Sequence, residues 1–128
     1  MTEPTENTPQ IGFFKLTVRN LEAARDFYVT AFGMMAGPPI VQRDLTEMVL
    51  KSPGNPFALT LLSYAEEREV PIGSSYGPVG FCVVGMDQAI ARAEAAGAKL
   101  LRGPLSFGTV SYAFLESPDR HVIELIER

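Results

Sequence analysis

The feature that most constrains how this chain can fold is an internal repeat. One strand pattern, one helix pattern and three further strand patterns occur in residues 11–64, and the same order returns in residues 77–128. Val18 aligns with Val83 at an offset of 65 residues, and the last strands of the two halves align at an offset of 64 residues. A repeated unit of this size cannot bury its own hydrophobic face, so the two copies are expected to pack together. The sequence therefore predicts an α+β fold made of two βαβββ modules.

The first copy begins with side chains that alternate over residues 11–18, which predicts a strand. Its two faces are expected to carry Phe14, Leu16 and Val18 on one side and Phe13, Lys15 and Thr17 on the other. A helix is expected over residues 21–32, with Asn20 as its N-cap and Gly33 at its C-terminal end. Three short strands are expected to follow, at about residues 40–43, 47–51 and 57–63.

The second copy has the same pattern. A strand is expected over residues 79–84, and an alanine-rich helix over residues 87–96 that ends at Gly97. A strand should begin at Leu100 and be interrupted at Gly103-Pro104, and the last two strands are expected over residues 110–115 and 121–126.

The repeat also predicts how the domain is divided. Residues 1–10 are rich in Thr, Pro, Glu and Asn and are expected to form a flexible tail. Residues 65–76 should be a solvated linker between a first module at 11–64 and a second at 77–128. Two curled, mixed sheets in one domain would enclose a concave, partly apolar groove, which is a usual place for a small-molecule site.

Composition excludes several classes of partner. The chain is 46% hydrophobic and 20% charged, which is ordinary for a globular protein, and its net charge of −4 disfavours nucleic-acid binding. No apolar run is long enough to cross a bilayer, and the polar N-terminus does not resemble a secretory signal. The single cysteine, Cys82, excludes an intrachain disulfide and is expected to be a small buried hydrophobe. We therefore expect a cytoplasmic protein with neither nucleic-acid nor membrane partners.

Three stretches resemble the vicinal oxygen chelate superfamily, which includes glyoxalase I, the extradiol dioxygenases and the bleomycin-resistance proteins. They are FFKLTVRNLEAARDFYVTAFGM in the first copy, and YGPVGFCVVGMDQAIARAEAAGAKL and FLESPDRHVIELIE in the second. The resemblance covers nearly the whole chain and implies the glyoxalase-like fold. It implies no particular activity, because one fold hosts many different sites.

The resemblance also implies four strand positions that hold a divalent metal in the enzymes of this family, commonly as His or Glu. In this chain they fall on Phe13, Thr60, Pro78 and Glu124. Phenylalanine and proline have no ligating atom in their side chains, threonine is a poor ligand, and one carboxylate cannot hold such an ion alone. His121, the only histidine, is three residues before Glu124 and is expected on the opposite face of the strand. We therefore expect no metal site and no cofactor.

A groove without a metal could still hold a ligand. Its expected lining comprises Phe13, Lys15, Phe57, Thr60, Pro78, Tyr112, Phe114 and Glu124. Glu124 is the candidate catalytic residue, and the competing interpretation is a structural carboxylate paired with Lys15 or with a tyrosine hydroxyl. The aromatic residues could form a ligand cage or belong to the core.

Three functions remain open. The first is a metal-independent binding protein, similar to the bleomycin-resistance branch, which would be a homodimer that sequesters a small hydrophobic or aromatic molecule. The second is a divergent lyase, isomerase or dioxygenase-like enzyme that uses Glu124 with Lys15 or Tyr112, or a metal held by unexpected ligands. The third is a structural or regulatory dimer whose groove is filled by its own side chains.

Overall fold

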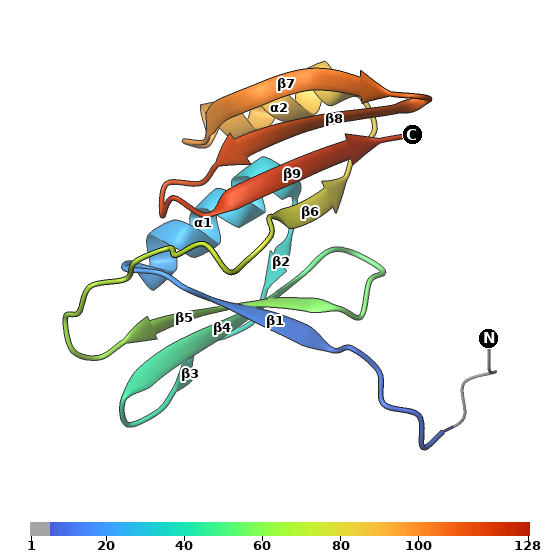
Figure 1. Cartoon of the computed structure of the whole chain (residues 1–128). Helices are drawn as coiled ribbons and strands as arrows, with labels where there is room; N and C mark the ends of the chain where they lie inside the picture. Colours follow the sequence, from blue (N-terminus) through green and yellow to red (C-terminus); the bar gives the residue numbers. More distant parts are fainter. Residues whose placement is uncertain (1–5) are drawn as a thin grey trace.

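The computed structural model describes residues 6–128, so half of the predicted tail lies outside the described residues. The first module contains β1 (Phe13–Thr17), α1 (Leu21–Phe32), β2 (Met35–Ala36), β3 (Ile40–Val41), β4 (Leu45–Lys51) and β5 (Ala58–Tyr64). The second module contains β6 (Val79–Cys82), α2 (Met86–Ala95), β7 (Lys99–Phe107), β8 (Val110–Glu116) and β9 (Val122–Glu127). Figure 1 shows the two modules as separate sheets, connected by the long loop from β5 to β6.

Each module forms one mixed sheet. The strand orders are β1-β5-β4-β2, with β3 paired to β4, and β6-β9-β8-β7. In both sheets the first strand is parallel to the last strand of its module and occupies an edge. Lys15 pairs with Thr60 in the first sheet, and Gly80 pairs with Glu124 in the second. These pairs are related by the offsets of 65 and 64 residues found in the sequence, so the predicted α+β fold with two βαβββ-like modules is confirmed.

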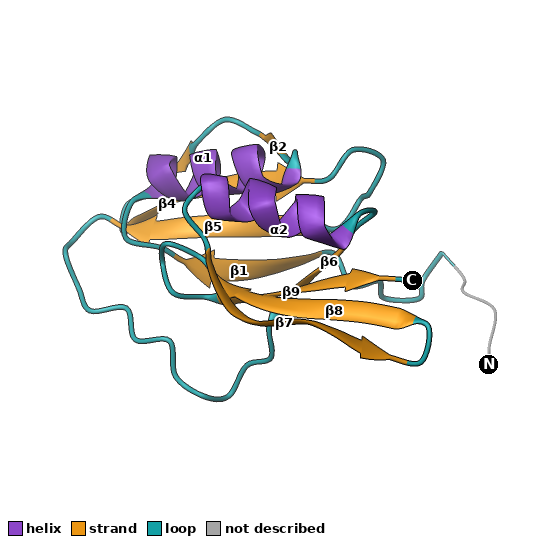
Figure 2. Ribbon diagram, turned by 90° about the horizontal axis from the view of Figure 1, so that it is seen from above, coloured by secondary structure: helices purple, strands orange, loops and turns teal. Residues whose placement is uncertain are grey.

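The two helices lie on the same side of the molecule and cover both sheets (Figure 2). The apolar stripe of α1 and the apolar face of α2 are buried, and the helices pack against each other. One continuous core lies beneath them, and it includes Leu16, Tyr28, Leu61, Leu115 and Leu125. Burial of this shared core is what holds the two modules together.

The two helices are capped by different residues, although their modules are similar. The Asn20 side chain accepts a hydrogen bond of 2.9 Å from the Ala23 amide, and Gly33 ends α1 with a φ of 66°, as predicted. Helix α2 begins after Gly85, which has no side chain to cap it. The Glu127 carboxylate takes this role from β9 and accepts hydrogen bonds from the amides of Gly85 and Met86 at 2.5 and 3.1 Å. A carboxylate at this end of a helix is also favoured by the helix dipole.

Some predicted boundaries were wrong. The short strand β2 was not predicted, because two residues carry too little pattern to be recognised. The predicted interruption at Gly103-Pro104 is instead a register irregularity within one continuous strand, β7. A Cβ atom on Gly103 would lie 2.9 Å from the Tyr112 carbonyl oxygen, so this position on β7 requires glycine.

Within the described part of the chain, two hydrogen bonds also connect the modules. Arg92 in α2 donates from Nε to the carbonyl oxygen of Thr30 in α1 at 2.8 Å. The Arg19 amide donates to the Asp119 carboxylate at 3.2 Å. The modules therefore meet through their helices and the 117–120 turn. Among the described residues, no helix is long and apolar enough to cross a membrane.

Candidate functional site: two cavities between the modules

Two cavities lie between the first strands of the modules and the 65–78 linker. The larger has a volume of about 730 Å³ and the smaller a volume of about 450 Å³. Both volumes lie within the range of small-molecule sites in proteins. The predicted linker thus forms a wall of both cavities as well as connecting the modules.

The larger cavity is mostly apolar. It lies against the N-terminal end of β1, the 52–57 turn and β6. Its apolar lining consists of Ile11, Phe14, Met34, Pro53, Phe57, Leu59, Tyr76, Pro78, Val79 and Phe81. Phe81 is fixed by stacking on Phe32, with ring centroids 4.0 Å apart and planes inclined by 10°. Cys82 also lines this cavity and is exposed, so the prediction that it is a buried hydrophobe was wrong.

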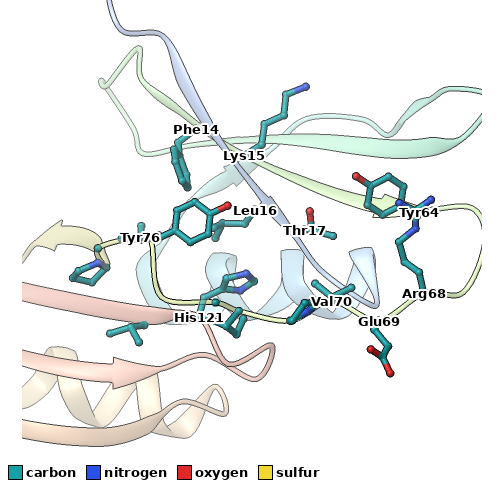
Figure 3. A pocket seen from close by; sticks show the side chains of 17 residues that line it. Phe14, Lys15, Leu16, Thr17, Tyr64, Arg68, Glu69, Val70, Tyr76 and His121 are labelled. Atoms are coloured by element: carbon teal, nitrogen blue, oxygen red, sulfur yellow. The ribbon is translucent and has the colours of Figure 1, made fainter.

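The smaller cavity carries more hydrogen-bonding groups. Figure 3 shows the Tyr76 ring between Phe14 and His121, with Thr17 and Tyr64 farther along the same cavity. No described residue makes a hydrogen bond with the hydroxyl group of Thr17, Tyr64 or Tyr76. Leu16 and Val70 contribute apolar surface between these groups.

His121 lies at the wall of the smaller cavity, and its backbone is held there by two hydrogen bonds to Ser117. Its amide donates to Ser117 Oγ at 3.1 Å, and its carbonyl oxygen accepts from the Ser117 amide at 2.8 Å. Its Nδ1 atom is buried and has no hydrogen-bond partner among the described residues. Burial lowers the pKa of His121, against a smaller opposing effect of the Asp119 charge, so the imidazole is neutral at pH 7.

The two cavities share a wall. Phe14 and Tyr76 line both of them and meet edge to face, with ring centroids 6.3 Å apart and planes inclined by 84°. Gly77, Pro78 and Val79 also line both cavities. The cavities are therefore neighbours, separated by one aromatic pair and one short segment.

The cations near the smaller cavity already have partners. Lys15 forms a short ion pair with Glu47, and Gln42 donates to the other oxygen of the same carboxylate at 3.0 Å. Figure 3 shows the Lys15 side chain pointing away from the cavity. The hydrogen bond from Lys15 lowers the pKa of Glu47. The proposed pairing of Lys15 with Glu124 is therefore wrong, and no described residue pairs with the Glu124 carboxylate.

The eight residues of the predicted groove fall in three places. Phe13, Lys15 and Thr60 lie together on the first sheet, where Lys15 Nζ is 5.6 Å from the Phe13 ring centroid. Tyr112, Phe114 and Glu124 lie together on the second sheet, where the two rings are 5.9 Å apart and Phe114 pairs with Glu124. Phe57 and Pro78 line the larger cavity, and Pro78 with Lys15 lines the smaller.

Sequence reasoning missed most of the cavity lining. The sequence predicted Phe14 only as part of a strand face and Tyr76 only as part of a connecting loop. It placed His121 on the strand face opposite Glu124. Two signals could have singled them out. Tyr76 is the one aromatic residue of the 65–76 linker, and His121 is the only histidine of the chain.

The four positions of the family metal site do not suit a divalent ion. Phe13 is 59% exposed and offers only a ring, and Thr60 is buried in β5. Pro78 has no donor atom, which leaves only the Glu124 carboxylate. Within residues 6–128, no three His, Cys, Asp or Glu side chains lie close enough to form an alternative site.

Comparisons with known proteins agree with this fold. The sequence profile of the Glyoxalase/Bleomycin resistance protein/Dioxygenase superfamily matches residues 10–125. Lactoylglutathione lyases of Neisseria meningitidis serogroup A and Escherichia coli O157:H7 are each 28% identical, over 88% of this chain and 86% and 87% of their own length.

Solved structures give the same result. Glyoxalase I from Zea mays matches with a TM-score of 0.83 and 23% identity, over 93% of this chain and 44% of that chain. A glyoxalase family protein from Bacillus cereus matches with a TM-score of 0.82 and 14% identity, over 97% and 98% of the two chains. At these identities the structural matches show the fold alone.

Proposed function

This chain belongs to the Glyoxalase/Bleomycin resistance protein/Dioxygenase superfamily, and from that premise we propose that it is a metal-independent small-molecule binding protein. The observation that carries the proposal is the combination of a lost ligand set with an open, mostly apolar cavity. Three of the four family metal positions have no suitable donor atom, whereas about 730 Å³ of space lies between the modules. Capture of a ligand needs shape and apolar contact, which such a cavity can provide.

The walls of the larger cavity favour a hydrophobic or aromatic ligand. Phe14, Phe57 and Phe81 offer ring faces and edges, and Met34 adds a flexible apolar side chain. Because Phe81 is already stacked on Phe32, little conformational entropy is lost when a ligand packs against it. This open volume also favours a binding protein over a structural dimer with a filled groove.

Cys82 allows a direct test of this proposal. It is the only cysteine, it is exposed, and it lines the larger cavity. A panel of small aromatic molecules should be screened by thermal shift, and each hit should then be tested for protection of Cys82 against a maleimide reagent. We expect hits that raise Tm and slow the labelling of Cys82. Hits that raise Tm with no effect on the labelling of Cys82 would contradict binding in the larger cavity. A panel without hits would contradict the proposed small-molecule binding function.

A second candidate function is supported by the sequence relatives. Lactoylglutathione lyases are 28% identical over most of this chain, and Glu124 remains at a position where the family has a ligand. A divergent lyase or isomerase would then use Glu124 as an acid-base group. Lactoylglutathione lyase activity should be measured with and without added divalent ions, and with Glu124→Gln as the control. Activity that is lost in this variant would favour the enzyme.

We also propose that the protein is a cytoplasmic homodimer. Strands β1 and β6 are edge strands, and side chains beside them are unusually exposed for apolar residues, with Ile11 at 84% and Phe13 at 59%. Exposed apolar surface beside an open strand edge favours association with a second copy. Sedimentation velocity should give a dimer at micromolar concentration, and Phe13→Asp should shift it toward the monomer. A monomer at all concentrations would contradict the proposal.

A further inference from the structure

We infer that the two cavities form one bipartite site for an amphipathic molecule, with an apolar body in the larger cavity and an uncharged, hydrogen-bonding head in the smaller cavity. This inference rests on the proposed small-molecule function and specifies the class of ligand. It depends on three features of the described residues, which are the contrast between the two linings, their shared wall, and the pairing of the nearby charges.

The two linings differ in chemistry. The larger cavity offers the rings of Phe57 and Phe81 and the aliphatic side chains around them. The smaller cavity offers the hydroxyl groups of Thr17 and Tyr64 and the imidazole of His121. A ligand with one apolar end and one polar end matches these two linings. Each end enters the cavity in which its transfer from water is least costly.

His121 gives the head a specific partner. Its Nδ1 atom is enclosed by protein, whereas its Nε2 atom is not buried and has no hydrogen-bond partner among the described residues. A ligand hydroxyl can bond to Nε2, because a hydroxyl both donates and accepts and thus suits either tautomer of a neutral imidazole. The free hydroxyl groups on the same cavity can complete the hydrogen bonds of such a head.

The shared wall allows one molecule to occupy both cavities. Phe14 and Tyr76 form this wall, and Tyr76 is 69% exposed on the linker. Its only described aromatic contact is the edge-to-face pair with Phe14. A pair of this kind contributes about 1 kcal/mol. A Tyr76 side chain with so few restraints can turn aside and open a passage between the cavities.

The charges favour an uncharged head. Arg68 lies 3.6 Å from the Tyr64 ring centroid and is paired with Glu66 at 2.5 Å, and Lys15 is paired with Glu47. Glu69 is the remaining charged residue of the smaller cavity, and its side chain points outward in Figure 3. An anionic or cationic head would therefore lose its hydration without gaining a free counter-charge.

The test compares four probes by calorimetric titration. They are 4-butylphenol, butylbenzene, phenol and 4-butylbenzoate. We expect 4-butylphenol to bind once per chain, with an affinity up to about tenfold above that of butylbenzene, which is the effect of one or two hydrogen bonds. Phenol alone and 4-butylbenzoate should bind more weakly than 4-butylphenol. Equal binding of 4-butylphenol and butylbenzene would overturn the bipartite site while leaving the proposed function in place. No binding of any probe would contradict both.

Matched variants locate the two ends of the probe. His121→Leu and Thr17→Val should abolish the preference for 4-butylphenol over butylbenzene and leave butylbenzene binding within about twofold of the original protein. Phe57→Ala should weaken the binding of both probes to the same extent and keep the preference for 4-butylphenol over butylbenzene. Phe107→Ala removes an aromatic side chain that is 80% exposed and lines neither cavity, so it should change nothing. A preference that survives both His121→Leu and Thr17→Val would overturn the inference.

Discussion

The Arg92 guanidinium in α2 donates a hydrogen bond of 2.8 Å to the backbone carbonyl oxygen of Thr30 in α1. Thr30 lies in the last turn of its helix, where carbonyl groups have no partner within the helix and the helix dipole favours a cation. This bond joins the C-terminal end of α1 to α2 and adds to the packing of the two helices against each other.

Arg92→Ala should lower the free energy of unfolding by about 1 kcal/mol, because it removes an exposed hydrogen bond from a charged donor. Urea denaturation measures this change. Arg43→Ala is a suitable control, since Arg43 is exposed and makes no side-chain hydrogen bond in the described part of the chain. An equal loss in both variants would contradict the role of Arg92.

Glu127→Ala should lower the free energy of unfolding more than Arg92→Ala does, by about 1 to 2 kcal/mol. It leaves two amides at the start of α2 without a partner. The loss should be seen in urea denaturation and in hydrogen exchange at Gly85 and Met86. Glu116→Ala, at the end of β8, provides the comparison for a carboxylate that caps no helix. Unchanged exchange at the two amides would contradict the capping role.

Tyr28→Phe should stabilise the protein at high pH. Burial raises the pKa of Tyr28, with Asp119 adding to the effect and Ser117 opposing it, although Tyr28 makes no hydrogen bond of normal geometry. In the folded state the hydroxyl therefore keeps its proton above the ordinary pKa of 10.0, whereas the unfolded chain loses it. The stability of the original protein should be unaffected by this group below about pH 10 and should fall above it, by up to about 1.4 kcal/mol per pH unit.

The measurement is urea denaturation of both proteins at pH 7 and at several values above 10. At pH 7 the two should differ by less than about 1 kcal/mol, because the hydroxyl has no hydrogen bond to lose. An equal fall in stability for both proteins above pH 10 would show that Tyr28 is not the responsible group.

His121→Leu should reduce the loss of stability on mild acidification. Because burial lowers the pKa of His121, the unfolded chain binds a proton before the folded chain does, and stability falls as the pH drops below the ordinary value of 6.5. Thermal unfolding at pH 7.5 and 5.5 measures the difference. Between pH 7.5 and pH 5.5 the Tm of the original protein should fall further than the Tm of the variant. An equal fall in both would contradict a buried, neutral His121.

The fold could be predicted from the sequence because each module is locally consistent. The alternation over residues 11–18 put Leu16 and Val18 on one face, and both are buried. Asn20 and Gly33 marked the ends of α1. The repeat offsets of 65 and 64 residues relate the observed pair Lys15–Thr60 of the first sheet to the observed pair Gly80–Glu124 of the second. These features depend on side-chain periodicity and on turn chemistry, and short stretches of sequence determine both.

The site was predicted less well, because it depends on how the modules pack. The cavities are bounded by the linker and by the edges of both sheets, and no local pattern determines where Tyr76 or His121 lies relative to Phe14. The partner of Lys15 illustrates the same difficulty. Glu47 lies on β4 of the same sheet, with β5 between it and β1, and pairs with Lys15. Glu124 belongs to the other sheet.

If this protein binds small molecules without a metal ion, it should have no high-affinity site for a divalent ion. The most direct measurement is calorimetric titration of chelator-treated protein with nickel, zinc, manganese and iron(II), with Glu124→Gln as the control. We expect no tight binding, and any weak binding should be the same in the control because a single carboxylate cannot hold the ion. Tight binding near one ion per chain that Glu124→Gln abolishes would contradict metal-independent binding.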